Sequence, residues 1–519
     1  MDEKNLSSMT DAEFEALLED NLPPQPPDAV AHDVTPWRKA LQYILVGMAL
    51  TTVTFQVLYL QYILPFAGIL LMLLGFRTLR QENIWFKACF LLTAVRTAFT
   101  IGLCIVNASI VQNILYDWDA KLPLLTIGNI ALLFALFLCF RQALLTVQDQ
   151  VGLPRHAGGV TALPVWYGIL SLLALAALGG WLLSIPMLIA YGFMLHALVK
   201  ISREVANAGY AVHPTAPRLS NRNLVLLLTS IVLVGIFCAS FFGSKYSMEW
   251  MERDPAERAD VSAIKEELLS KGFPEYVLHD MTAEDIAACE GAVRIFARHQ
   301  DLPINPGHEE ARIEGNTTCL YTAYDAEELR LTQIGVLLPG EQQRWQIIHH
   351  FSFTEDPGFC GTECIKLSPA YQNPDMGWQG NDKNLSGRVL YTDKDGREYV
   401  SPYFFLGPQT YIKDSPLFGV SRNHDLFAAF SFPRGDKQQR GYLCYPMEAL
   451  GSSGTIDASI FYTHQYTLRN YPAKTAMEHC MSGRSFHTPP FLTAHDALQL
   501  FPCHGEYGCF EGNGIPVLS

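Results

Sequence analysis

Long apolar runs separated by short polar turns dominate the first half of the chain. Seven are legible, near residues 41–60, 63–76, 87–108, 122–140, 163–179, 182–199 and 223–243. A helix needs about 20 apolar residues to cross the ~30 Å hydrocarbon core of a bilayer. The pattern therefore predicts a membrane α-helical bundle of about seven spans within residues 37–245, with the lipid bilayer as its partner. Residues 41–76 are numerous enough for two tightly joined helices.

Residues 246–300 show a different, shorter helical pattern. Ile264, Leu268 and Leu269 recur at helical spacing, and Gly272 followed by Phe and Pro is a stop signal. Thr282 begins a second capped segment that is expected to continue to Arg294. We therefore predict a small helical juxtamembrane segment here.

Residues 301–519 show the alternation of polar and apolar positions that is typical of β-strands. Seven runs, separated by turn-forming residues, are expected to be strands: 344–353, 364–371, 387–391, 398–406, 426–432, 441–446 and 459–467. Strands of this number and spacing predict an exported α+β or mainly-β domain, most simply an antiparallel β-sandwich. Two neighbouring residues, His349 and His350, fall within one run and must point to opposite faces.

The basic residues beside the apolar runs predict the orientation of the chain. Loops on one side hold eleven of them, and loops on the other side hold only Lys121 and Lys245. The positive-inside rule then places the N-terminus in the cytoplasm and residues 246–519 outside the plasma membrane. The eleven are Arg38, Lys39, Arg77, Arg80, Lys87, Arg141, Arg155, Lys200, Arg203, Arg218 and Arg222.

Net charge divides the chain into three parts. Residues 1–36 hold nine acids against one lysine, residues 37–245 hold fourteen bases and five acids, and residues 246–519 hold twenty-two bases and thirty-seven acids. An acidic exported domain repels nucleic acid, so we expect no nucleic-acid partner.

The acidic tail, residues 1–36, contains one patterned segment. Residues 10–22 read as a short amphipathic helix, because Thr10 and Glu13 match a capping box and Phe14, Leu17 and Leu18 share one face. A proline-rich spacer follows. One hypothesis is a docking motif for a cytoplasmic protein within residues 10–27. The other is a solvated tail with slight helical bias, since isolated helices of this length are marginal.

Three polar residues of the membrane domain are candidates for function. Arg96 lies near the middle of the third span, where a guanidinium costs at least ~2.5 kcal/mol and needs acceptors. Asn129 is a candidate partner, and His196 lies within the sixth span. The alternative is a span shifted to 97–115, which would place Arg96 at the inner interface.

Eight cysteines lie in the part of the chain predicted to be exported, where an oxidising setting favours disulfides. The close pairs Cys360 with Cys364, and Cys503 with Cys509, favour local bridges. A zinc site near Cys503 is a weaker hypothesis because the cysteine spacing matches no known zinc motif. The eight candidates are Cys289, Cys319, Cys360, Cys364, Cys444, Cys480, Cys503 and Cys509.

Catalytic signatures are missing from the sequence, which shows no H-E-x-x-H, G-x-S-x-G, P-loop or dinucleotide-binding motif. We therefore expect binding in preference to catalysis, with no cofactor and no metal. The strongest ligand candidate is a loop that mixes aromatic rings with oxygen-bearing side chains, which suit a glycan, a peptide, another small molecule or calcium. The alternative is that the loop is an ordinary solvated one. Its residues are Tyr371, Asp375, Trp378, Asn381 and Asp382.

Three stretches resemble uncharacterised bacterial multi-pass membrane proteins that carry a large exported C-terminal domain. These are Thr35-Pro-Trp-Arg-Lys-Ala, the stretch from Leu64-Pro-Phe-Ala-Gly through Leu74-Gly-Phe-Arg, and Lys271-Gly-Phe-Pro-Glu-Tyr-Val-Leu with Glu284-Asp-Ile. The resemblance implies no activity. The architecture favours a sensing, regulatory or surface-anchoring membrane protein; the alternatives are a transporter or translocation subunit, and a membrane-tethered ectoenzyme.

Overall fold

The computed structural model divides the chain into two compact units, Met1–Ile105 with Leu115–Val234, and Val106–Ile114 with Gly235–Ser519. The amphipathic segment 10–22 and the docking hypothesis for residues 10–27 lie outside the described residues. The structure describes residues 35–519 except 54, 56–58, 113–123, 157, 176–180, 213–218, 255–260, 315–316, 341–343, 360, 369–377, 381–383, 416–418, 436, 450–455, 483–489, 504–505, 512–514 and 518–519.

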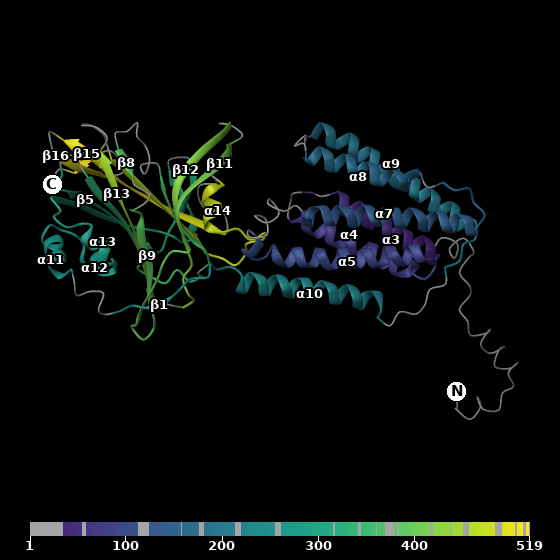
Figure 1. Cartoon of the computed structure of the whole chain (residues 1–519), viewed down its shortest axis with the longest axis horizontal. Helices are drawn as coiled ribbons and strands as arrows, with labels where there is room; N and C mark the ends of the chain where they lie inside the picture. Colours follow the sequence, from purple (N-terminus) through teal and green to yellow (C-terminus); the bar gives the residue numbers. More distant parts are fainter. Residues whose placement is uncertain are drawn as a thin grey trace, which may run out of the picture. The chain divides into compact units, whose positions relative to one another are not determined.

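The first unit is built from apolar helices, one for each predicted span (Figure 1). Five helices in the described part of the chain, α4, α5, α7, α9 and α10, are long and apolar enough to cross a membrane. The other two, α3 and α8, are shorter, so the count of seven spans stays a prediction. The bounds are α3 Pro36–Thr52, α4 Leu60–Leu79, α5 Ile84–Val106, α7 Leu124–Gln150, α8 Gly158–Leu175, α9 Trp181–Asn207 and α10 Asn221–Phe242.

Helices α3 and α4 form the tight pair expected from residues 41–76. The Thr35 side chain accepts a hydrogen bond from the Arg38 amide and Pro36 follows, which is a favourable helix start. The two helices cross at glycines: a Cβ built on Gly68 would lie 2.6 Å from the carbonyl oxygen of Gly47. Small residues at such crossings let helix backbones approach closely in a membrane.

The second unit contains two antiparallel sheets (Figure 1). The eight-stranded sheet has the order β1 (Met251–Glu252), β10 (Glu398–Ser401), β9 (Ser386–Thr392), β13 (Lys437–Ala449), β6 (Arg344–Phe353), β5 (Leu329–Leu338) and β2 (Arg294–Leu302), with β8 (Trp378–Gly380) also on β13. The seven-stranded sheet has the order β11 (Phe405–Ser415), β12 (Gly419–Phe430), β7 (Glu363–Ser368), β14 (Ile456–Gln465), β15 (Phe491–Cys503), β16 (Glu506–Glu511) and β17 (Ile515–Val517). A separate hairpin joins β3 (His308–Glu314) to β4 (Thr317–Ala323).

The two sheets pack face to face around one core. Trp345 and Phe351 from the eight-stranded sheet and Phe430 and Tyr462 from the seven-stranded sheet belong to the same buried cluster. This is the packing of a β-sandwich, as the sequence predicted. The mostly antiparallel β-architecture after a helical region is therefore confirmed.

Helices cover the outer faces of both sheets. We call α11 (Ser262–Ser270), α12 (Glu275–Asp280) and α13 (Ala283–Ala287) the helical cap. The cap packs through Leu268, Val277 and Ile286 against Ile348 and its neighbours on the eight-stranded sheet. The short helix α14 (Ala476–Met481) packs on the outer face of the seven-stranded sheet.

Three sequence expectations about this unit are wrong. Seven strands were expected, and the described residues form seventeen, in sheets of eight, seven and two strands. The second juxtamembrane helix ends at Ala287, and Arg294 begins strand β2, because residues 294–302 pair along their whole length with β5. The single strand expected at 398–406 is two strands, β10 and β11, which belong to different sheets. Pro402 lies between them, and proline lacks the amide hydrogen that a continuous ladder requires.

Candidate functional site: an ionic cluster beneath the helical cap

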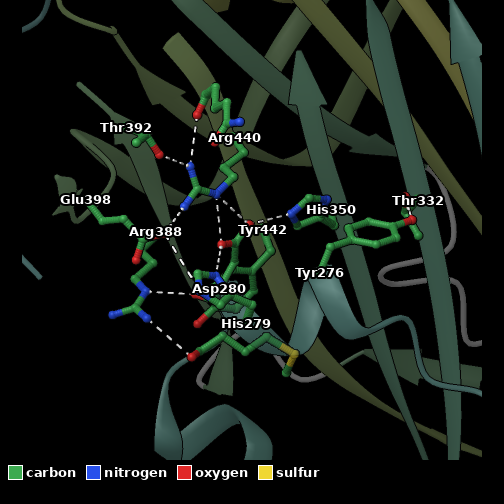
Figure 2. Close-up of polar contacts among 12 residues, drawn as sticks. Tyr276, His279, Asp280, Thr332, His350, Arg388, Thr392, Glu398, Arg440 and Tyr442 are labelled. Carbon is green, nitrogen blue, oxygen red and sulfur yellow. Dashed lines mark hydrogen bonds and ion pairs between the residues drawn. The ribbon is translucent and has the colours of Figure 1, made fainter. Parts of the chain in front are cut away.

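The most concentrated set of buried charges that we find in the described second unit lies between the helical cap and the eight-stranded sheet. Its centre is Asp280, the last residue of α12, whose carboxylate points to the sheet (Figure 2). The His350 ring nitrogen Nε2 lies 2.9 Å from Asp280 Oδ2, and the two side chains are only 1% and 2% exposed. His350 reaches the cap because Trp345, Ile347 and the other odd-numbered residues of β6 face the sandwich core.

Arg440 on β13 joins Asp280 to the neighbouring strands. Its Nε donates to both carboxylate oxygens of Asp280, at 2.9 and 3.0 Å. Its terminal nitrogens donate to Glu398 on β10 at 2.7 Å and to Thr392 on β9 at 2.9 Å (Figure 2). One guanidinium therefore fixes the cap to three strands.

Arg253 extends the cluster to the segment that follows the last apolar helix. Strand β1 pairs with β10 through Met251 and Glu252, and Arg253 comes directly after it. Its side chain forms an ion pair of 3.2 Å with Glu398 and donates to the backbone oxygen of His279 in the cap. The polypeptide leaving α10 is thus attached to both the sheet and the cap.

Arg388 neutralises the end of helix α12. Its Nε donates to the backbone oxygen of Asp280 at 3.0 Å, and a terminal nitrogen donates to that of Met281 at 3.3 Å. These carbonyls at a helix C-terminus have no partner within the helix, and a cation there is favourable. Beside it, the Tyr442 hydroxyl donates to Asp285 at 2.5 Å and joins α13 to β13.

The cluster keeps Asp280 ionised. Burial by itself raises the pKa of a carboxyl, but hydrogen bonds from His279 and His350 and the charges of His350 and Arg440 outweigh burial and hold the pKa of Asp280 well below its usual range. Three guanidinium groups face two carboxylates, since Arg253, Arg388 and Arg440 surround Asp280 and Glu398. The site is therefore a buried ionic network that depends on the charge of one aspartate.

This arrangement is suited to holding the cap and is poorly suited to catalysis. A histidine on a buried aspartate matches two members of a hydrolytic triad. However, the other ring nitrogen of His350, Nδ1, has no hydrogen-bond partner within the described residues, so no described serine or cysteine is bound to it. Both side chains are also sealed from solvent. The sequence singled out His350 but gave no signal for Asp280 or Arg440, because the contacts join distant residues.

The predicted ligand loop is described only at one point. Tyr371, Asp375, Asn381 and Asp382 lie outside the described residues. The backbone of Trp378 forms β8, where it pairs with Ala449 at the end of β13. The proposed ligand contacts of this loop stay a prediction.

The three intramembrane candidates do not form one site. Arg96 is partly buried near the middle of α5, and its depth in the membrane stays a prediction. Asn129 and His196 are exposed on α7 and α9.

A hydroxyl network that the sequence analysis missed lies in the same unit. Thr52 Oγ1 lies 2.6 Å from the Tyr167 hydroxyl and donates to the Tyr191 hydroxyl at 3.0 Å. Tyr191 was expected to be an interior hydrogen-bonding residue, whereas Tyr167 carried no signal because it lies within an ordinary apolar run.

The cysteines after residue 245 whose side chains the structure describes are all free thiols. These are Cys289, Cys319, Cys364, Cys444 and Cys480. Cys360 and the side chains of Cys503 and Cys509 lie outside the described part, so the local bridges stay untested. Among the described residues, no group of three His, Cys, Asp or Glu side chains is placed to hold a metal ion.

Comparisons with known proteins add little to the site. No family model matches the sequence. No curated protein matches it. A solved structure described as a pore-forming protein is similar over 37% of this chain and 95% of its own, at 8% identity and a TM-score of 0.16. A similarity at that TM-score establishes neither a shared fold nor a shared function.

Proposed function

We propose that the chain is a polytopic plasma-membrane protein whose exported β-domain binds a ligand or partner and passes that event to helix α10. The eleven-to-two distribution of basic residues supports a cytoplasmic N-terminus and an exported C-terminal unit. Five apolar helices in the described residues support the membrane embedding. Burial closes the His350–Asp280 pair to solvent, which favours binding over catalysis for this domain.

The observation that carries this proposal is the attachment of Arg253. Only the short segment 243–250 separates α10 from β1, and Arg253 after β1 bonds to both Glu398 and the cap. A ligand that moved the cap would have to break or rearrange these ion pairs. The change would then reach the segment directly connected to α10, which is a physical route for a signal.

We place the ligand at the loop around Trp378, within residues 371–386. The loop combines an aromatic ring with carboxylate and amide groups, which suits a glycan, a peptide or another small polar molecule. Its strand β8 lies against β13, which also carries Arg440. Trp378 pairs with Ala449, nine residues along β13 from Arg440, so β13 itself connects the loop to the ionic cluster.

The topology is tested first. Single cysteines engineered at positions 30 and 436 in the full chain are exposed to a membrane-impermeant maleimide in intact cells. We expect labelling at position 436 in intact cells. We expect labelling at position 30 only after the cells are lysed. The reverse result would overturn the exported location of the β-domain.

Ligand binding is tested on the full-length protein in nanodiscs. Glycans, peptides and divalent cations are screened by thermal shift, and generic ester, peptide and glycoside substrates are screened for turnover. We expect a ligand that raises the unfolding midpoint, and we expect Trp378→Ala to remove that shift. Trp181→Ala, in the helical unit, is the matched control. A thermal shift that persists in Trp378→Ala would show that the ligand does not bind at this loop. Turnover that is lost when one histidine or aspartate is replaced would show that the domain is an enzyme.

A transporter is the second candidate, favoured by one observation in the helical unit. Arg96 lies near the middle of a candidate span, and the linked hydroxyls of Thr52, Tyr167 and Tyr191 are the kind of polar groups that line a substrate path. Uptake of a small anion that Arg96→Ala abolishes and Arg77→Ala leaves intact would favour this function over the first.

A further inference from the structure

Cys364 and Cys480 are far apart in the sequence and adjacent in the second unit. Cys364 lies on β7 directly opposite Thr463 on β14 in the antiparallel register. Residues paired in this way point to the same face of the sheet, with their Cβ atoms about 5 Å apart. The Thr463 hydroxyl lies 3.0 Å from the sulfur of Cys480, which α14 carries over this face. Cys480 therefore sits above the Cys364–Thr463 pair.

Helix α14 is anchored so that its last turn holds Cys480 in this position. Thr475 and Glu478 form a capping box at its start. The amide of Ala476 donates to the Thr362 hydroxyl, two residues before Cys364, at 2.9 Å. Both cysteines belong to the same small core, in which Cys364 is fully buried and Cys480 partly exposed.

The two thiols differ in reactivity. Burial, together with a hydrogen bond between the two sulfurs, raises the pKa of the Cys364 thiol. The interaction with Cys364 lowers the pKa of Cys480, and the Thr463 hydroxyl adds to the effect. The more exposed thiol is therefore the one that ionises first, which suits it to attack an external oxidant.

We propose that Cys364 and Cys480 form a disulfide bond that fixes α14 to the seven-stranded sheet. A thiol oxidant that carries a disulfide supplies the oxidising equivalents. The Cys480 thiolate attacks one sulfur of the oxidant and releases the other as a thiol. Cys364 then gives up its proton and its sulfur attacks that of Cys480, which releases the second thiol of the oxidant. Two thiols are oxidised, and one disulfide is reduced to two thiols.

Cys289 and Cys444, the other described cysteines of the second unit that share a core, are less suited to a disulfide bond. Cys289 and Cys444 share a core beneath the cap, but the Cys289 thiol donates to the backbone oxygen of Asp285 at 3.5 Å and Cys444 accepts from the Gln346 amide at 2.8 Å. Within the described residues, Cys480 is the cysteine that interacts with Cys364.

The bond would stabilise a longer region than α14 itself. The amide of Ala473, just before the helix, donates to the backbone oxygen of Asn107 at 2.7 Å. Asn107 belongs to the segment after α5 that forms part of the second unit. A covalent link at Cys480 therefore restrains the chain on both sides of this contact.

The pairing is tested on the full-length protein in membranes. Free thiols are alkylated without reductant, and the protein is digested with trypsin and a protease that cuts after Glu363, which separates Cys360 from Cys364. We expect a cross-linked peptide pair that contains Cys364 and Cys480 and disappears on reduction. Cys480→Ser should abolish it, and Cys319→Ser, on the exposed β3–β4 hairpin, should leave it intact. Reductant should lower the unfolding midpoint of the wild type and Cys319→Ser but not of Cys480→Ser.

The oxidation step rests on the proposed export of the domain, and a second arm separates the two claims. Purified protein is treated with oxidised glutathione. A Cys364–Cys480 disulfide that forms with oxidised glutathione but is absent from the protein in membranes supports the pairing and counts against export. Alkylation of both cysteines in membranes and after glutathione treatment overturns the pairing, as does a bond between Cys364 and Cys360.

Discussion

Asp280→Asn is expected to lower the free energy of unfolding of the second unit by about 3 kcal/mol. Removing one partner of a buried ion pair typically costs 3–5 kcal/mol, because the remaining charge is left uncompensated. The lower end applies here because Arg440 keeps its 2.7 Å ion pair with Glu398. For a unit of this size the unfolding midpoint should fall by roughly 5 °C. Calorimetry on the full chain in nanodiscs measures it.

Asp395→Asn is the matched control, because Asp395 lies in an exposed turn between β9 and β10. We expect this substitution to change the midpoint by less than about 2 °C, since exposed substitutions are usually within ±0.5 kcal/mol. Equal midpoints for the two variants would show that the ionic cluster does not hold the cap.

The lowered pKa of Asp280 predicts that the free energy of unfolding depends on pH. The folded state holds the pKa of Asp280 below its usual range, so this carboxylate stabilises the fold at any pH above its ordinary pKa of about 4. The contribution is lost as the pH falls below that value, because the proton binds more tightly to the unfolded chain. The unfolding midpoint of the wild type should therefore fall more steeply between about pH 5 and pH 3 than that of Asp280→Asn.

Gly68→Val is expected to separate helices α3 and α4. A Cβ at Gly68 would lie 2.6 Å from the carbonyl oxygen of Gly47 and 2.8 Å from the side chain of Thr51, which is closer than real Cβ contacts. Overpacking of this kind costs about 1–3 kcal/mol or more, and backbone atoms cannot yield as a flexible side chain does. Unfolding in mixed micelles should occur at a lower fraction of SDS.

Gly102→Val provides the control for this prediction. Gly102 lies in α5, and a Cβ there meets nothing within 4 Å. The change in helix propensity from glycine to valine is the same at both positions, so the difference between the variants isolates the helix crossing. If both variants unfold at the same SDS fraction, the α3–α4 contact does not stabilise the unit.

Local pattern was sufficient where a single physical period governs a segment. Each predicted span coincides with a helix, because a long apolar run has few other stable conformations in a membrane. The run 344–353 is β6 with the predicted bounds, and its alternation correctly places His349 and His350 on opposite faces. Within the described residues, five of the helices meet the length and hydropathy needed to cross a bilayer.

Local pattern failed where a partner decides the conformation. Residues 294–302 form β2 because they pair with β5. Strand β5 is buried at most of its positions, so its sequence shows little alternation of polar and apolar residues. The run 398–406 is divided between two sheets, a choice that depends on the neighbours β9 and β12.

The sequence by itself determined the helical first part, the β-rich second part and the distribution of charge between them, because hydrophobic period and composition are local properties. Only the tertiary structure decided which charges meet. Asp280 bonds to His350 across 70 residues and to Arg440 across 160. Cys364 meets Cys480 for the same reason, since sheet register brings Thr463 opposite Cys364 and helix packing carries Cys480 over both. Such contacts depend on how strands pair and layers pack, and a pattern along one segment contains no record of its partner.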